Sequence, residues 1–178
     1  MVEEMESGGL AAPLDALKAY LRIGTAGEDD VMGDLLRGAS ALCEQFTGQW
    51  LIRRDVREIV AGGGAWQRLT ARPVAEIMQV EAMDAQGVTE PLPVGAYAID
   101  IDASGDGWVR STRAGDRRRL AVRYRAGLSE DVAGLPEALV QGIVRLAAEH
   151  FLAQGTQGAA PPAMVSALWR PFRRMRLS

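Results

Sequence analysis

Cysteine and histidine are almost missing from this sequence of 178 residues, which contains one of each, Cys43 and His150. A single cysteine cannot form an internal disulfide, so the class of disulfide-stapled secreted proteins is excluded, and we interpret Cys43 as a small core residue. A serine or cysteine nucleophile needs a positioned base, and no such set surrounds the one histidine. We therefore interpret His150 as a packed side chain and predict that the protein is not an enzyme.

Long apolar runs are also missing. The sequence contains no run of roughly eighteen apolar residues, the length that spans a bilayer, and its first ten residues, MVEEMESGGL, are acidic. It therefore predicts neither a transmembrane helix nor a signal peptide. We expect a cytosolic protein that makes no contact with a membrane and leaves the cell only inside an assembly.

Charge is distributed unevenly along the chain, although the net charge is only -3. Residues 1–50 contain nine acidic and three basic residues, whereas residues 151–178 contain four arginines and no acidic residue. Opposite charges at the two ends permit identical subunits to meet head to tail.

Helical periodicity marks both ends of the chain. Leucines at spacings of three and four predict a helix over 13–21. A second helix is predicted from Glu28 to Gly48, with Thr25 and Glu28 spaced as a capping box. Its expected apolar face is Val31, Leu35, Ala39, Leu42 and Phe46.

The helical pattern returns near the C-terminus. Residues 136–152 form two neighbouring apolar stripes, so this helix should lie at the centre of the helical core. The sequence AQGTQGAAPPA follows as a linker, and Pro171 ends a last short helix over 163–169.

The middle of the chain has the alternating pattern of strands, most clearly at Leu120, Val122 and Tyr124. Further strands are predicted over 50–60, 76–83, 95–101 and 107–111, as a small antiparallel sheet of hairpins. The predicted fold class is α+β: a helical core of three to four helices with a small antiparallel β insertion and an extended C-terminal tail. The expected organisation is an acidic N-terminal extension over 1–12, a helical core over 13–49 and 135–154, a strand-rich insertion over 50–134, and a linker and docking tail over 155–178.

Two acidic segments resemble metal sites. Asp100, Asp102, Ser104 and Gly105 follow the spacing of a calcium loop, but the twelfth position is Ser111 where a bidentate Glu is needed. We therefore interpret this segment as a polar hairpin turn. The acids after Gly27 are explained by a helix N-terminus, which favours negative charge. We predict no metal and no cofactor.

The C-terminal sequence PPAMVSALWRPFRRMRLS is the strongest candidate for an interaction site. Its linker uncouples it from the preceding helix, and aromatic side chains interleaved with arginines suit pockets rimmed by carboxylates. We expect it to dock on a neighbouring protein and to add little to its own fold; the alternative is that it folds back as a last core helix. The candidate binding residues are Val165, Leu168, Trp169, Arg170, Phe172, Arg173, Arg174, Met175 and Arg176.

Two charged groups are candidates for contacts between subunits. One is acidic and lies at the start of the second helix, and the other is an arginine-rich hairpin that either faces a partner or is simply solvated. The residues are Glu28, Asp29, Asp30 and Asp34 in the first group, and Arg113, Arg117, Arg118 and Arg119 in the second.

Three blocks of the chain resemble the head-tail connector (adaptor) proteins of long-tailed phages and gene transfer agents. The first runs from LDALKAYLRIG through the acidic stretch to the TG stop at 47–48, the second is LPEALVQGIVRLAAEHFLAQG, and the third is PPAMVSALWRPFRRMRL. The resemblance covers about 14–52 and 135–178, and residues 53–134 correspond to a variable strand-rich insertion.

The resemblance implies a structural protein. Copies would assemble as a ring beneath the portal protein, following its twelve-fold symmetry, and would offer a platform to the next tail component, a stopper or tail terminator. DNA would pass through the channel without specific binding. The protein would be found in the host cytoplasm during assembly and then at the head-tail interface of the particle, with the C-terminal segment docking on the portal.

A sequence-independent DNA-binding protein is the alternative reading, since an arginine-rich tail also suits phosphates. The acidic net charge of the whole chain argues against it.

Overall fold

The computed structural model describes residues 2–4, 9–113, 118–153 and 161–174. The chain divides into two compact units. A β unit combines Met1–Gly8 with Arg53–Leu128, and a helical unit combines Gly9–Ile52 with Ser129–Ser178. The predicted α+β class is confirmed.

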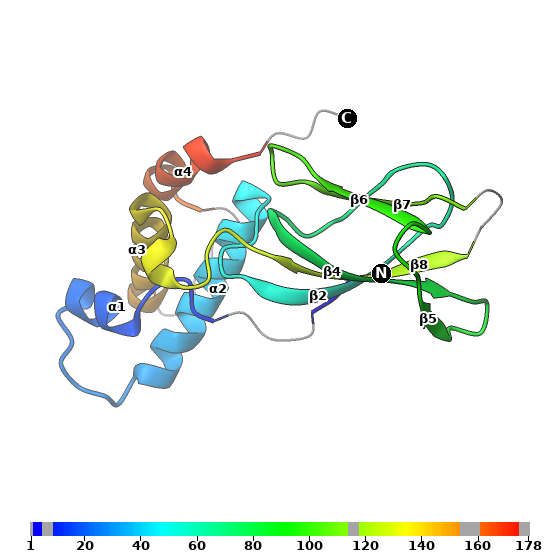
Figure 1. The fold of residues 1–178 in the computed structure, drawn as a ribbon. Helices are drawn as coiled ribbons and strands as arrows, with labels where there is room; N and C mark the ends of the chain where they lie inside the picture. The colour runs from blue at the N-terminus through cyan, green and yellow to red at the C-terminus, as the bar shows by residue number, and fades with distance from the viewer. Residues whose placement is uncertain (1, 5–8, 114–117, 154–160, 175–178) are drawn as a thin grey trace. The chain divides into compact units, whose positions relative to one another are not determined.

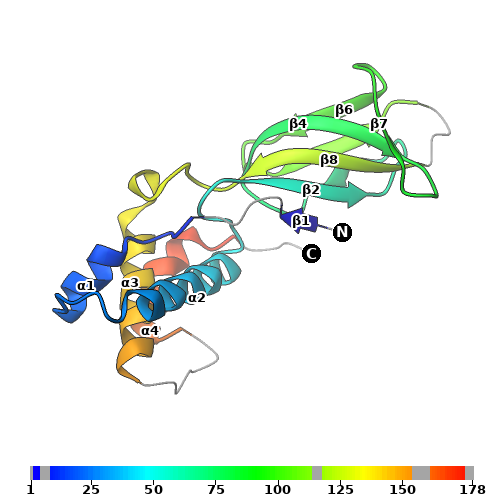
Figure 2. The same cartoon turned by 90° about the horizontal axis from the view of Figure 1, so that it is seen from below.

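The helical unit is built around one central helix (Figures 1 and 2). This helix, α3, contacts each of the other three α-helices of the described chain, as its two apolar stripes predicted. Short 3-10 turns, η1 and η2, precede α3 and follow α4. The bounds are α1 (Leu14–Leu21), α2 (Asp29–Thr47), η1 (Val132–Gly134), α3 (Glu137–Leu152), α4 (Ala163–Trp169) and η2 (Arg170–Phe172).

The second helix, α2, begins and ends where expected, but its predicted N-terminal capping box is absent. Glu28 is the N-cap and makes no side-chain capping bond; Asp29 instead accepts a 2.7 Å hydrogen bond from Lys18 Nζ of α1. At the other end Gly48 adopts a φ of 69°, which is accessible to glycine without steric cost, and donates to Glu44 O.

The buried face of α2 is rotated from the predicted one. Ala39 is fully buried as predicted, but Val31 is 55% exposed and Leu35 and Leu42 are only half-buried. Their neighbours Met32, Leu36 and Cys43 are fully buried instead. The sequence allows both faces because apolar residues occupy adjacent positions, 31 with 32 and 35 with 36. Packing against α3 decides between them, and it leaves Val31 uncovered by the described part of its own unit.

The β unit contains two antiparallel sheets. One has five strands in the order β1-β2-β8-β4-β5, and the other has three in the order β3-β7-β6. The predicted strands are present, and β1, β3 and β5 are short additions that sequence reasoning missed. The bounds are β1 (Val2–Glu4), β2 (Arg54–Val60), β3 (Gln67–Arg68), β4 (Val74–Met83), β5 (Thr89–Pro91), β6 (Tyr97–Ile101), β7 (Gly107–Ser111) and β8 (Arg119–Ala126).

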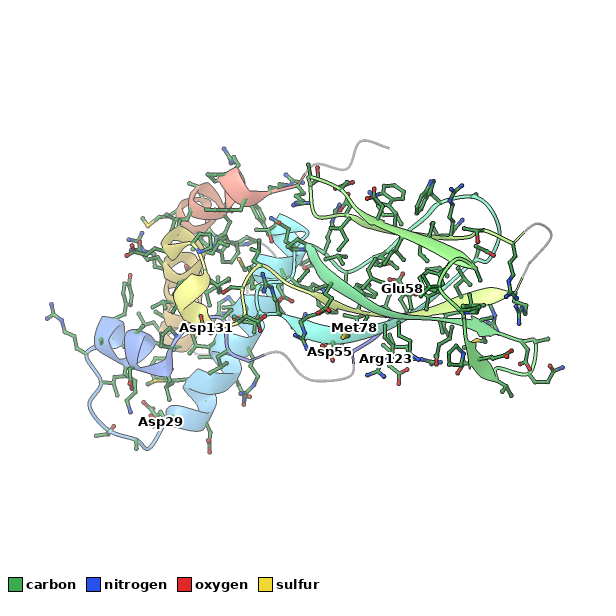
Figure 3. All side chains as sticks on the ribbon, in the orientation of Figure 1. Asp29, Asp55, Glu58, Met78, Arg123 and Asp131 are labelled. Carbon is green, nitrogen blue, oxygen red and sulfur yellow. The ribbon has the colours of Figure 1, made fainter. Side chains whose placement is uncertain are left out.

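A buried polar network crosses the core of the β unit. Glu58 is only 5% exposed, and its carboxylate accepts hydrogen bonds from Tyr124 Oη at 2.7 Å and from the Thr70 amide and hydroxyl at 2.9 and 2.5 Å. The Tyr124 oxygen in turn accepts from the Ala71 amide at 3.1 Å. Figure 3 shows Glu58 on one side of the five-stranded sheet and Arg123 on the other, as strand alternation requires.

We expect alkaline pH to destabilise both units. Burial raises the pKa of the Cys43 thiol, and burial together with the Glu58 hydrogen bond raises the pKa of the Tyr124 hydroxyl. The unfolded chain therefore loses these protons from about pH 8.5 and 10, while the folded chain keeps them, so the free energy of unfolding falls by about 1.4 kcal/mol per pH unit for each group. Urea titrations between pH 8 and 11 should show this slope, and Tyr124→Phe should reduce it above pH 10; identical slopes would contradict the assignment.

Among the helices of the described ranges, none combines the length and apolarity needed to cross a bilayer.

Candidate interaction surfaces

The last helix, α4, packs onto its own subunit. Val165 and Trp169 are buried, and the Trp169 ring is fully enclosed between α2 and α3. Its centroid lies 5.8 Å from that of Phe46, and its Nε1 donates to the Leu139 carbonyl at 3.3 Å. The indole therefore has both an apolar environment and a hydrogen-bond acceptor, as a buried tryptophan requires.

A glycine in α3 makes room for the indole. A Cβ placed on Gly142 would lie 2.1 Å from Trp169 Nε1 and 2.9 Å from Cδ1 and Cε2, distances that real Cβ atoms do not show. The absence of a side chain at 142 therefore permits α4 to lie against α3. Sequence reasoning did not single out Gly142, although a glycine inside a strongly helical pattern often has a packing reason.

Gly142→Ala is expected to lower the free energy of unfolding by about 1–3 kcal/mol, because the added methyl forces the enclosed indole to shift. Gly38→Ala is the matched control. Gly38 also lies inside a helix, but nothing lies within 4 Å of a Cβ added there. Its replacement should therefore raise the free energy of unfolding by about 0.5–1 kcal/mol, because alanine has the higher helix propensity. Chemical denaturation of the two variants checks this; equal shifts would contradict the close packing.

The segment after α4 is also fixed to its own unit. Gln49 Nε2 donates to Phe172 O at 2.7 Å, and the Arg174 amide donates to Thr47 O at 3.0 Å. Arg174 Nε donates to Gln49 Oε1 at 3.1 Å, and the Arg173 guanidinium lies 5.6 Å from the centre of the Phe46 ring. The expectation that the C-terminal segment adds little to its own fold is therefore wrong for residues 163–174. The alternative, a last core helix, is the observed arrangement.

The packing of α4 and the segment after it buries some of the nine candidate docking residues and leaves others exposed. Val165 and Trp169 face the interior and offer no surface to a partner. Arg170 and Arg173 are exposed, and Leu168, Phe172 and Arg174 are half-buried. Met175 and Arg176 lie outside the described residues. The exposed arginines are thus carried by an element that the core holds in place.

The candidate acidic group lies at the start of α2, where Figure 3 marks Asp29. Asp29 pairs with Lys18, and Asp34 pairs with Arg37 one turn later on the same helix. Glu28 and Asp30 are exposed. Of the four carboxylates, those of Asp29 and Asp34 therefore form ion pairs within the helical unit.

The candidate arginine group lies at the start of β8 and before it, in the β unit. Arg113 and Arg119 are exposed, while Arg118 is half-buried and lies 3.9 Å from Glu90. Arg117 falls outside the described residues. At that separation in water the pair with Glu90 adds little stability.

The segment that resembles a calcium loop forms the predicted turn, between β6 and β7. Asp102 Oδ1 accepts from the amides of Ser104 and Asp106 at 2.8 and 3.0 Å, and Oδ2 accepts from Trp108 Nε1 at 3.1 Å. The carboxylate therefore closes the turn. Within the described ranges, no group of three or more His, Cys, Asp or Glu side chains is arranged to hold a metal ion.

No protein-family model and no curated protein matches the chain. Solved structures do match over its whole length. A chain of "Neck of empty GTA particle computed with C6 symmetry" is 25% identical with a TM-score of 0.81, and the match covers 100% of this chain and 97% of that one.

Two further structures agree. A chain of "Virion of native gene transfer agent (GTA) particle" is 27% identical with a TM-score of 0.80, and one of "Neck of native GTA particle computed with C12 symmetry" is 26% identical with a TM-score of 0.75. Each match covers 100% of this chain and 97% of the other. The β unit, which the sequence resemblance did not reach, is thus included. The comparisons confirm the predicted resemblance, because the chain is similar over both units to chains of gene transfer agent particles, two of them described as the neck.

Proposed function

We propose that the protein is a structural head-tail connector (adaptor) subunit. Copies assemble as a ring beneath the portal, continue its DNA channel and join the capsid to the next tail component, a stopper or tail terminator. The observation that carries this proposal is the match, over both units, to chains of particle necks. DNA passes through the ring without specific binding, and the protein's role is assembly, not catalysis.

The C-terminal element is the proposed portal-binding surface. Because Trp169 and Gln49 hold it, Arg170 and Arg173 are presented by an ordered element. A pre-ordered surface loses less conformational entropy on binding than a flexible tail. The proposed contact residues are Leu168, Arg170, Phe172, Arg173 and Arg174 with Met175 and Arg176, whereas Val165 and Trp169 position the element.

Contacts between subunits are proposed to include the acidic start of α2. The exposed carboxylates of Glu28 and Asp30 are available to a cationic surface of a neighbour, with Asp29 and Asp34 as supporting charges. Arg113, Arg118 and Arg119, with Arg117, remain a proposed cationic surface of the β unit. Exposed charge pairs of this kind weaken as salt rises, since the screening length is about 10 Å at 0.1 M.

Co-sedimentation with the purified portal protein tests the proposed function. The wild-type chain should sediment with the portal, and the double variant Arg170→Glu, Arg173→Glu should not, because charge reversal turns attraction into repulsion. Arg22→Glu, at an exposed arginine at the end of α1, is the control and should bind as the wild type does. Failure of the wild-type chain to bind the portal, together with salt-sensitive binding to DNA, would favour the DNA-binding alternative instead.

A further inference from the structure

An apolar groove runs along α3 between α1 and α4. Its floor is formed by Val140, Val144 and Ala148 of α3, with Tyr20 of α1 on one wall and Met164 of α4 at one end. Two hollows of about 520 and 400 Å³ lie along it and share Tyr20 and Arg145. No residue of α2 lines either hollow, so the groove lies on a side of α3 that α2 leaves open. The exposed apolar side chains are those at its edges, Tyr20, Leu152 and Met164, at 57%, 70% and 64% exposure, and exposed apolar surface of this kind marks an interaction site.

A cation without a carboxylate partner lies in this groove. Arg145 lines both hollows, and its Nη1 lies 2.9 Å from the sulfur of Met164. Among the described residues Arg145 makes no ion pair, although it is only half-exposed. Glu137 and Glu149 also line the hollows, one in each, but both side chains are exposed, neither pairs with Arg145, and Glu137 accepts a 2.8 Å hydrogen bond from Gln141 Nε2. The complementary occupant therefore presents an apolar side chain to the floor and a carboxylate to the guanidinium.

The outer face of α2 has this chemistry. Val31 is 55% exposed, and Asp30 and Asp34, beside it in sequence and one turn on, are exposed as well. Asp34 already pairs with Arg37, whereas Asp30 makes no ion pair within the described ranges. An aliphatic side chain next to an available carboxylate is the combination that the groove requires.

We propose that the groove of one copy of this chain receives the first turns of α2 from a second copy, with Val31 against the apolar floor and Asp30 facing Arg145. The two surfaces are different, so the contact is heterologous, and a heterologous contact forms a ring when the rotation between neighbours closes on itself. The inference rests on the proposed function and adds to it the surfaces through which neighbouring subunits meet.

Chemical cross-linking tests the contact. The double variant Val31→Cys, Met164→Cys places two exposed thiols on the proposed partner surfaces, and the native Cys43 is buried. Complexes with the portal protein are treated with a short bismaleimide and analysed on denaturing gels. We expect a ladder of dimers, trimers and higher species from the double variant and only monomer from either single variant.

The control pairs Met164→Cys with Val94→Cys, an exposed position in the β unit, and should give no ladder. Rings on the portal without a ladder from the first pair, or with an equal ladder from the control, would overturn the inference and leave the proposed function intact. Absence of any portal complex would refute the proposed function, and the inference would fall with it.

Charge reversal gives a second readout. Arg145→Glu should reduce the amount of chain bound per portal at least about tenfold, because it places two carboxylates together, and Asp30→Arg in the same chain should restore most of it. Circular dichroism melting confirms that both variants are folded. A folded Arg145→Glu variant that binds at the wild-type ratio, or a reversal pair that restores nothing, would refute the proposed pairing.

Discussion

Replacing Trp169 by alanine is expected to lower the free energy of unfolding by about 3–5 kcal/mol, the usual cost of removing a large enclosed aromatic side chain. The ring is 0% exposed, contacts Phe46 and donates to the Leu139 carbonyl, so the variant loses packing and leaves a cavity between three helices. Urea denaturation followed by circular dichroism measures the effect.

Met164→Ala is the control for Trp169→Ala. Met164 lies on the same short helix but is 64% exposed, and its truncation should change stability by no more than about 0.5 kcal/mol. If Trp169→Ala unfolds at the wild-type urea concentration, α4 does not belong to the helical core, and the flexible docking tail would again be the better description.

Replacing Glu58 by alanine is expected to have the second large effect. It should lower the free energy of unfolding of the β unit by about 2–5 kcal/mol. The Tyr124 hydroxyl and the Thr70 amide would lose their acceptor in a buried site, and each unsatisfied donor costs about 1–3 kcal/mol. Glu90→Ala removes a carboxylate that is 81% exposed and should be nearly neutral. Hydrogen exchange of β8 amides reports the change locally; equal protection in both variants would show that the network adds no stability.

The sequence predicted most helices and strands because their patterns are local. The leucine spacing of α1, the apolar stripes of α3 and the alternation of β8 each depend on side chains only a few residues apart. The pairing of β2 with β8, which aligns Asp55 with Arg125, joins segments some seventy residues apart, and no local pattern predicts it. The strand at Val2–Glu4 was missed for the same reason, because β1 is stabilised by pairing with β2.

The interaction surfaces were predicted less well than the fold. The glycines and prolines before α4 indicated a flexible linker, but they do not determine where the next helix packs; the complementarity of Gly142 and Trp169 does, and it appears only in three dimensions. Likewise, adjacent apolar residues in α2 left the buried face ambiguous. Arg145 is one of several polar residues of α3 in the sequence, and only the groove around it indicates a role.

The most direct test of the connector role is an electron-microscopy reconstruction of the portal protein mixed with this chain. We expect a closed ring of copies on the portal axis with an open central channel. The C-terminal element of the helical unit should lie at the portal, and α2 of each subunit should lie in the groove of its neighbour. Single copies scattered on the portal, or a portal with no added density at saturating protein, would contradict it.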